Sequence, residues 1–306
     1  MKTRTATLAA RITAAAVLGA SAAAASGTVA SAAGTADCDG GRIVFLREGN
    51  GPPVIYVMTA QGRGLRSLGV GHAPAWSPDG RWIAFDDSQH ILRMHPDGSA
   101  VTDLTPALTN VNSFDPSWSP DGRWIVFSSE PAGTRDAALW LVRSDGSGLH
   151  ELVNAPGEEE HPSWSPDGSR IVFDSFPPVG PDHLYIVRSS GRDLDRVTPD
   201  SLDAWGPSWS SRNVIAFADG ASNITSDIFT MDPDGSHLRQ LTHAPLGITI
   251  ALPGFSPDGA NITFTRFNKT FTGSEIHRMT ASGEDRRELT RGQPGTNGFS
   301  QWGVCS

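Results

Sequence analysis

One short motif, W-S-P-D-G-x-x-I-x-F, recurs along the chain at nearly constant spacing. Three copies match it fully, as in WSPDGRWIAF, and two are altered, in SWSSRNVIAF and GFSPDGANITF. The aromatic anchors lie 42, 46, 45 and 46 residues apart and are Trp76, Trp118, Trp164, Trp209 and Phe255. A repeat of about 40 to 50 residues is typical of propeller blades. The spacing therefore predicts a ring of like units with no room for long helices.

An apolar run ending in a turn follows each copy of this motif, as in ILRMHPDG from Ile91. A sixth run of this kind, IYVMTAQG from Ile55, precedes the first W-S-P-D-G and indicates a sixth unit. Gly, Pro and Asp residues divide each unit into four short strands. We therefore predict an all-β fold, a six-bladed β-propeller of four-stranded antiparallel blades.

The repeated residues are interpreted as structural. An aromatic side chain present in every unit is explained by packing between blades, although stacking on sugar rings is an alternative. The Asp-Gly pairs, such as Asp234-Gly235, are interpreted as hairpin turns. A calcium loop is the alternative, but Ca²⁺ takes about six to eight oxygen ligands, more than these turns supply.

The two ends of the chain are predicted to complete one blade together. The N-terminal unit has no x-P-x-W strand, and Trp302 follows Phe255 by 47 residues, in phase with the other anchors. When both ends are aligned on the second unit, Cys38 and Cys305 fall at adjacent places in one turn, within reach of a disulfide. We predict that the C-terminal strand closes the ring and that this disulfide locks it. Two free thiols are the alternative.

The first residues have the pattern of a secretory signal. Lys2, Arg4 and Arg11 precede or flank an Ala-rich apolar run, and Ala30 and Ala32 form an A-x-A cleavage pattern. A membrane anchor is the alternative, but the run is shorter than the roughly 18 to 20 residues that a span needs. We predict a signal peptide over residues 1–32, a propeller domain over 33–306, an extracytoplasmic location and no transmembrane segment in the mature chain.

Charge limits the class of partner. The chain carries a net charge of −9, and residues 33–306 alone hold 21 basic and 33 acidic residues, a net charge of −12. No basic patch is available to bind a phosphate backbone, so nucleic acid is not expected as a partner. We expect a monomer.

The two motifs together resemble the TolB-like propeller repeat, also called the WD-like β-propeller repeat. The resemblance covers residues 39–306, and Gln301-Trp302-Gly303 is similar to the family's Asp-Trp-Gly ending. The fourth unit departs from it, with Ser211 and Arg212 where Pro and Asp are expected. The resemblance implies a propeller without the N-terminal α/β domain of TolB, and a partner-binding protein. Propeller hydrolases carry G-x-S-x-G, a motif this sequence lacks.

The candidate site lies at the mouth of the central channel, where each innermost strand is expected to begin. The residue before the x-P-x-W proline differs in every unit, whereas a structural role would repeat. These residues are Ala73, Asp115, His161, Gly206, Leu252 and, at the C-terminus, Phe299. With their neighbours they give the predicted ligand-binding set His72, Asp115, Glu160, His161 and Trp205.

Two functions from different classes remain open. The first is a non-catalytic exported propeller that binds a protein, peptide or cell-envelope ligand at the channel face, with no cofactor. The second is a metal-dependent lyase or hydrolase, with a divalent cation held at the channel by Asp115, Glu160 and His161. The run Glu158-Glu159-Glu160 fits binding of a cation or a basic peptide, and also a solvated acidic loop.

Overall fold

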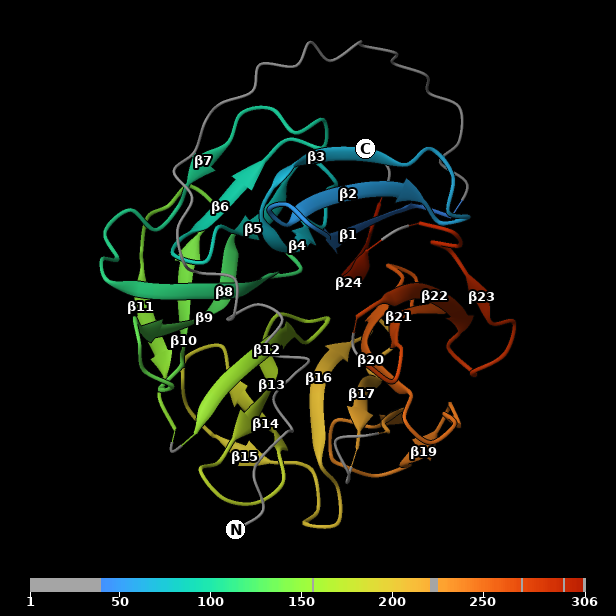
Figure 1. The fold of residues 1–306 in the computed structure, drawn as a ribbon. Coiled ribbons are helices and arrows are strands. Elements are labelled where there is room, and N and C mark those ends of the chain that lie inside the picture. The colour runs from blue at the N-terminus through green and yellow to red at the C-terminus, as the bar shows by residue number, and fades with distance from the viewer. Residues whose placement is uncertain (1–39, 156, 221–224, 271, 294, 305–306) are drawn as a thin grey trace.

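The chain folds into β-sheets arranged around a common centre, as Figure 1 shows for the computed structural model. The structure describes residues 40–155, 157–220, 225–270, 272–293 and 295–304. Every regular element in these ranges is a strand, which confirms the all-β prediction. The described residues hold no helix of the length and apolar character needed to cross a bilayer. The predicted signal peptide, Cys38 and Cys305 lie outside the described residues.

Four of the sheets are separate four-stranded antiparallel blades. The first contains β4 (His72–Trp76), β5 (Ile83–Asp86), β6 (Ile91–Met94) and β7 (Thr102–Asp103). The second contains β8 (Val111–Trp118), β9 (Trp124–Pro131), β10 (Ala138–Arg143) and β11 (His150–Val153). The third contains β12 (Glu158–Trp164), β13 (Arg170–Phe176), β14 (His183–Arg188) and β15 (Asp195–Arg196). The fourth contains β16 (Ala204–Trp209), β17 (Ile215–Asp219), β18 (Asp227–Met231) and β19 (Arg239–Gln240).

The remaining strands form one eight-stranded sheet from both ends of the chain. The N-terminal strands are β1 (Arg42–Glu48), β2 (Val54–Thr59) and β3 (Arg66–Val70). The C-terminal strands are β20 (Thr249–Phe255), β21 (Asn261–Phe267), β22 (Ser274–Thr280), β23 (Arg287–Glu288) and β24 (Thr296–Gly303). The last strand, β24, pairs antiparallel with β1, with Arg42 opposite Gly303. The expected joining of the two chain ends in one sheet is therefore present.

The W-S-P-D-G segments form tight turns held by their own side chains. In the second blade the Ser119 hydroxyl donates to Asp121 at 2.6 Å and accepts the Trp124 amide at 2.9 Å. Gly122 adopts φ +70°, which glycine does without steric cost. The altered copy SWSSRNVIAF keeps the turn with one residue fewer. There Val214 N–H donates to the Ser210 hydroxyl, and Asn213 takes the left-handed position at φ +61°.

The aromatic anchors lie between neighbouring sheets. Trp76, Trp118, Trp164, Trp209 and Trp302 are 5–8% exposed, and Phe255 is partly buried. The Trp118 indole N–H donates across to the Ala75 carbonyl at 3.1 Å, and Trp164 donates to Ser117 at 3.2 Å. Each of these bonds joins one blade to the innermost strand of the preceding blade. The anchors therefore fix the distance between adjacent sheets.

The innermost strands surround the centre of the molecule (Figure 1). They are β4, β8, β12, β16, β20 and β24, and each contacts the next along the chain. The cycle is completed by contact between β24 and β4, where the Gln301 side-chain oxygen accepts the Trp76 backbone N–H at 2.5 Å. The first and last parts of the chain therefore bound the same central channel.

We predict that Gly303→Ala destabilises the fold, because a Cβ at this position would overlap the ring of Trp76. Overpacking of this kind costs about 1–3 kcal/mol. Urea unfolding should give a lower midpoint for this variant. Gly49→Ala is the matched control, since nothing lies within 4 Å of a Cβ built there and its stability should stay within about 0.5 kcal/mol of wild type. Equal midpoints for the two variants would contradict the close approach of β24 to β4.

Candidate functional site

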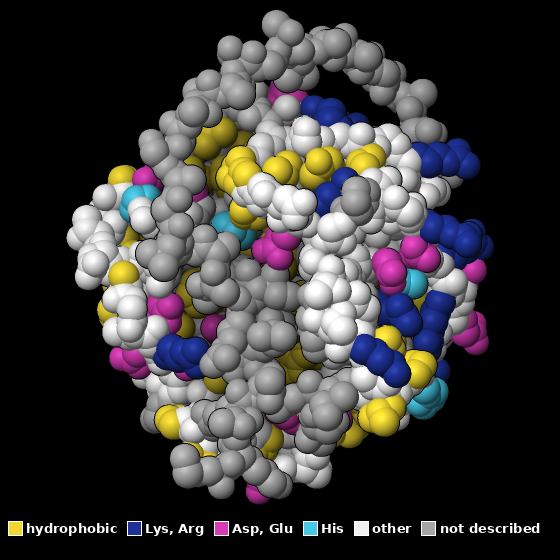
Figure 2. Space-filling model, in the orientation of Figure 1, with side chains coloured by type: hydrophobic (Ala, Val, Ile, Leu, Met, Phe, Trp, Pro, Cys, Tyr) yellow, Lys and Arg dark blue, Asp and Glu magenta, His cyan; other side chains and the backbone are white. Residues whose placement is uncertain are grey.

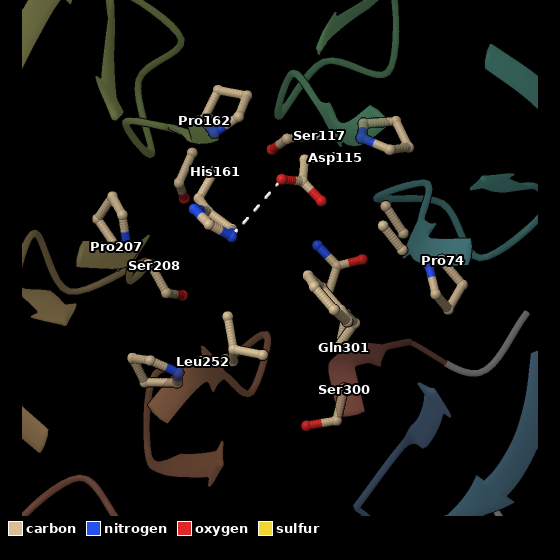
Figure 3. A pocket seen from close by; sticks show the side chains of 18 residues that line it. Pro74, Asp115, Ser117, His161, Pro162, Pro207, Ser208, Leu252, Ser300 and Gln301 are labelled. Carbon is tan, nitrogen blue, oxygen red and sulfur yellow. Dashed lines mark ion pairs between the residues drawn. The ribbon is translucent and has the colours of Figure 1, made fainter. Parts of the chain in front are cut away.

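A cavity of about 130 Å³ lies at the centre of the ring, enclosed by the innermost strands (Figure 3). Each of these strands contributes one triplet of consecutive residues to its wall. The triplets are residues 73–75, 115–117, 161–163, 206–208, 252–254 and 299–301. The cavity therefore samples one equivalent position from every unit, and the side chains at that position determine its chemistry.

A β-bulge places the first residue of each triplet. The register of the innermost strand shifts at this point in every unit, as between Glu160 and Ser163 or between Phe114 and Ser117. All six first residues have left-handed backbone angles: Ala73 (37°), Asp115 (54°), His161 (49°), Gly206 (61°), Leu252 (54°) and Phe299 (50°). For a non-glycine residue this conformation costs about 1–2 kcal/mol. Five of the six positions bear that cost.

The channel residues lie inside the innermost strands and not at their beginnings, which corrects the sequence-based expectation. His161 is the fourth residue of β12, and Asp115 is the fifth residue of β8. The reason is the bulge, which turns a residue towards the channel without ending the strand. The alternative of a solvated acidic loop also fails, because Glu158 to Glu160 open β12 and Glu159 is fully buried.

His161 is held between two carboxylates. Its Nδ1 lies 3.1 Å from Asp174 Oδ1, and its Nε2 lies 3.6 Å from Asp115 Oδ2 (Figure 3 marks the second pair). Asp174 is on β13 and is fully buried. Burial alone would lower the pKa of His161, but the charges of Asp174 and Asp115 raise it to about 10. The imidazole is therefore a buried cation at neutral pH.

Asp115 keeps one oxygen without a hydrogen-bond partner. Its side chain is 9% exposed, and Oδ1 is buried and unpaired within the described part of the chain. Burial raises the pKa of Asp115 to about 6, although His161 acts to lower it. Burial also raises the pKa of Glu160 well above its usual value; His161 opposes this shift and nearby carboxylates add to it. A buried acceptor facing a cavity is a place where a ligand donor would bind.

A second imidazole–carboxylate pair lies two blades away, in the blade β4–β7. His72 Nδ1 is 3.5 Å from Asp86 Oδ1, and both side chains are buried. Burial acts to lower the pKa of His72, but hydrogen bonding and charge from Asp86 raise it. His72 does not line the cavity, because it precedes the bulged residue Ala73. The charge of Asp86 raises the pKa of Asp115, so the two pairs are electrostatically linked.

The opposite part of the cavity wall includes apolar side chains, next to the hydroxyls of Ser208 and Ser300. Leu252 and Phe299 line it together with Gly206. The Phe299 ring stacks on His161 with ring centroids 6.3 Å apart and an interplanar angle of 16°. Trp205 packs against the hydrophobic cluster that includes Leu252 and does not line the cavity. Of the five predicted binding residues, the cavity therefore brings together Asp115 and His161, with Glu160 and His72 behind them.

Sequence reasoning missed Asp86 and Asp174, which hold the two imidazoles. The signal was present in the strand after each W-S-P-D-G turn. That strand reads IAFD at Asp86 and IVFD at Asp174, whereas the other units have Leu, Ser, Ala or Thr after the phenylalanine. A carboxylate in a buried strand needs a partner, and His72 and His161 on the adjacent strand supply it.

The cluster does not fit a metal centre. Both ring nitrogens of His161 face a carboxylate, Nδ1 facing Asp174 and Nε2 facing Asp115, so neither is directed at an open ligand position. Raised pKa values also favour the neutral form of Glu160. Within the described ranges, no three His, Cys, Asp or Glu side chains converge in a way that could hold a metal ion. The side chains of the cluster around His161 are arranged to accept and donate hydrogen bonds.

Comparison with known proteins identifies the class of this chain. The TolB beta propeller domain family matches residues 105–306, two thirds of the chain. The chain therefore belongs to the TolB β-propeller family. No curated protein matches the sequence.

Solved structures share the fold at low sequence identity. TolB from Acinetobacter baumannii has a TM-score of 0.72 and 20% identity, over 86% of this chain and 66% of that one. A putative TolB from Agrobacterium tumefaciens has a TM-score of 0.64 and 19% identity, over 81% and 88%. Puromycin hydrolase has a TM-score of 0.57 and 17% identity, over 84% of this chain and 46% of that one. This chain spans just under two thirds of the length of the first and less than half of the third.

We predict that the pKa of His161 depends on Asp174. In Asp174→Asn it should fall from about 10 towards the ordinary value of about 6.5. Because the folded-state pKa is raised, His161 stabilises the fold fully below about pH 6.5, and this contribution is lost as pH rises through about 10. Titration of the imidazole ring protons by NMR measures the shift.

Asp145→Asn, in an exposed turn, is the control for this titration and should leave it unchanged. The same midpoint in Asp174→Asn and wild type would show that the buried carboxylate does not hold the imidazolium.

Proposed function

We propose that this protein is an exported, non-catalytic propeller that binds a protein, peptide or cell-envelope ligand at the channel face. The observation that carries the proposal is the buried, unpaired Asp115 oxygen beside His161, on the wall of the central cavity. The bulges add support, because strained backbone conformations cluster at functional sites, and here the left-handed conformation recurs at all six positions around the cavity. Membership of the TolB propeller family is consistent with a binding role.

The cavity chemistry favours a ligand with a hydrogen-bond donor next to an apolar group. Asp115 presents the acceptor, and Leu252 and Phe299 present the apolar wall. The net charge of −9 disfavours nucleic acid as the partner. On the face shown in Figure 2, Lys and Arg side chains lie mainly along the right side, with acidic side chains among them.

We infer that the propeller has six blades. The eight-stranded sheet divides naturally into β20–β23 and β24–β1–β2–β3, because a single parallel residue pair, Ser274 with Thr296, joins the two halves. Each half then has four antiparallel strands like the separate blades. The six triplets around the cavity support the same number.

We also propose the remaining parts of the sequence-based picture: a signal peptide over residues 1–32, a propeller domain over 33–306, an extracytoplasmic location and a monomer. The disulfide between Cys38 and Cys305 is supported by the pairing of Arg42 with Gly303, which brings the described ends of the chain together. An exported protein is in a compartment that allows such a bond.

Peptide mapping without reductant tests the disulfide and should recover Cys38 and Cys305 in one linked peptide. Removing the link with Cys38→Ser should lower the free energy of unfolding by up to about 5 kcal/mol, because the closed loop is long. Under reducing conditions wild type and variant should unfold alike. Two unlinked cysteine peptides would refute the terminal disulfide and leave the channel proposal standing.

Pull-down from an envelope extract of the source organism tests the channel proposal. Asp115→Asn should recover the specific partner at least about tenfold less well than wild type, since a charged hydrogen bond contributes about 1.5–3 kcal/mol. Asp145→Asn makes the same change in an exposed turn away from the cavity and should bind like wild type. Equal recovery by both variants would mean that the channel face is not the binding site.

A further inference from the structure

A second cavity, of about 360 Å³, opens between two adjacent blades. It lies where the blade β8–β11 meets the blade β12–β15, on the left side of Figure 1. Leu141 forms part of its wall, together with Trp124 and Trp164. The carboxylates of Asp121 and Asp167 line it as well and are exposed. We call this cavity the β10 groove. It differs from most other junctions between neighbouring sheets, which an arginine side chain crosses.

Arginine side chains cross four of the other junctions between neighbouring sheets. Two come from the third strand of a sheet: Arg93 donates to the Ser144 carbonyl, and Arg278 donates to Ala60 at 3.3 Å. Two come from the fourth strand: Arg66 donates to Pro96 at 2.7 Å, and Arg239 donates to Ser282 at 3.0 Å. All four acceptors lie in the turn after the third strand of the next sheet. We call these contacts arginine bridges.

The arginines occupy one pair of cross-strand positions. Arg93 lies opposite Thr102, and Arg66 lies opposite Val57. In the blade β8–β11 the same pair is Leu141 and His150, so neither position holds an arginine. The residue equivalent to the acceptor Ser144 is Ser189, and it lines the β10 groove. The groove therefore has the acceptor side of an arginine bridge without its arginine.

The aromatic wall is also the one that an arginine uses elsewhere. The Arg93 guanidinium lies over the ring of Trp82, 4.1 Å from its centroid. Trp124 takes the place of Trp82 in the next blade and lines the β10 groove. The guanidinium of Arg143, from β10 itself, already lies over the Trp124 ring, 5.0 Å from its centroid, so an incoming guanidinium would use the rest of the indole surface. A guanidinium stacks well on an indole face, and a carbonyl and carboxylates satisfy its donors.

The rim carries the carboxylates of Asp121 and Asp167, and Arg123 Nε lies 3.9 Å from Asp121 Oδ2. Hydrogen bonds from Ser165 and Ser169 lower the pKa of Asp167 to about 2, so this carboxylate stays ionised. His150, also exposed, contacts the Gly148 carbonyl through Nδ1 at 2.7 Å. The blade β12–β15 lacks an arginine too, with Ile186 opposite Asp195. What distinguishes the β10 groove is therefore the cavity with its tryptophan and carboxylate walls.

We propose that the β10 groove is a docking site for an arginine side chain of a partner protein or peptide. The guanidinium lies against Trp124, donates to the Ser189 carbonyl and is balanced by Asp121 and Asp167. The partner completes from outside the bridge that Arg93 and Arg278 make from within. This site is separate from the central cavity and does not depend on the function proposed for it.

Binding of short blocked peptides tests the proposal. The probe is acetyl-Gly-Arg-Gly-amide, and the comparison peptide replaces arginine with citrulline, which has nearly the same shape without the charge. Two-dimensional NMR should place the arginine peptide at the indole N–H of Trp124, with at least about tenfold weaker binding of the citrulline peptide. Equal affinity of the two peptides, or shifts elsewhere only, would refute the proposal.

Two variants fill the groove from within. Leu141→Arg copies Arg93, and His150→Arg copies the fourth-strand positions of Arg66 and Arg239. Each should weaken arginine-peptide binding at least about tenfold by occupying the groove. His150→Arg keeps the test decisive if Leu141→Arg does not fold, because residue 150 is exposed.

The matched control is Asp195→Arg, which adds more positive charge at the equivalent position of the next blade. Asp195→Arg should bind the arginine peptide as wild type does. Weaker binding by this control would show a general effect of charge and would refute a specific site in the β10 groove. Undiminished binding to His150→Arg would also refute the proposal.

Discussion

The structure depends on closing the ring of innermost strands. Hydrogen bonds between β24 and β1 bring the ends of the chain into one sheet, and Gly303 lets β24 pack directly on Trp76 of β4. Without this closure, β4 would lose its neighbour and the central cavity would lack the wall formed by residues 299–301. The tryptophans between sheets, such as Trp118, then set equal spacing around the ring. Cavity, bulges and junction grooves all follow from that spacing.

The central cavity combines two kinds of cost that folding alone does not require. Asp115 and His161 have left-handed backbone angles and buried charged side chains. Asp174 is buried between His161 and the backbone N–H of Gly206. An apolar side chain in place of the Asp174–His161 pair would fill the same space without the cost of desolvation. The remaining free oxygen of Asp115 is the part that a ligand would use. The chemistry of the site is thus concentrated on one side of the ring.

The motif W-S-P-D-G-x-x-I-x-F was enough to predict the class of fold, because it fixes turns, strands and spacing at once. Divergence among repeated positions also located Asp115 and His161 on the cavity wall. The bulge could not be predicted, since Ala, Leu and Phe carry no local signal for left-handed backbone. Asp174 was missed because its contact with His161 is made across two adjacent strands, β12 and β13, and depends on their register. Trp205 was included although its ring packs in the core. Side-chain direction depends on packing that the repeat does not encode.

The six bulges restrict which side chains can line a cavity of this kind. Positive φ disfavours β-branched residues most strongly, and the six positions hold Ala, Asp, His, Gly, Leu and Phe, with no Val, Ile or Thr. The rest of the wall is formed by the prolines and serines beside them, with Ala75, Gly254 and Gln301. One scaffold can therefore present many different recognition surfaces by exchanging six side chains, within an alphabet that the backbone itself restricts.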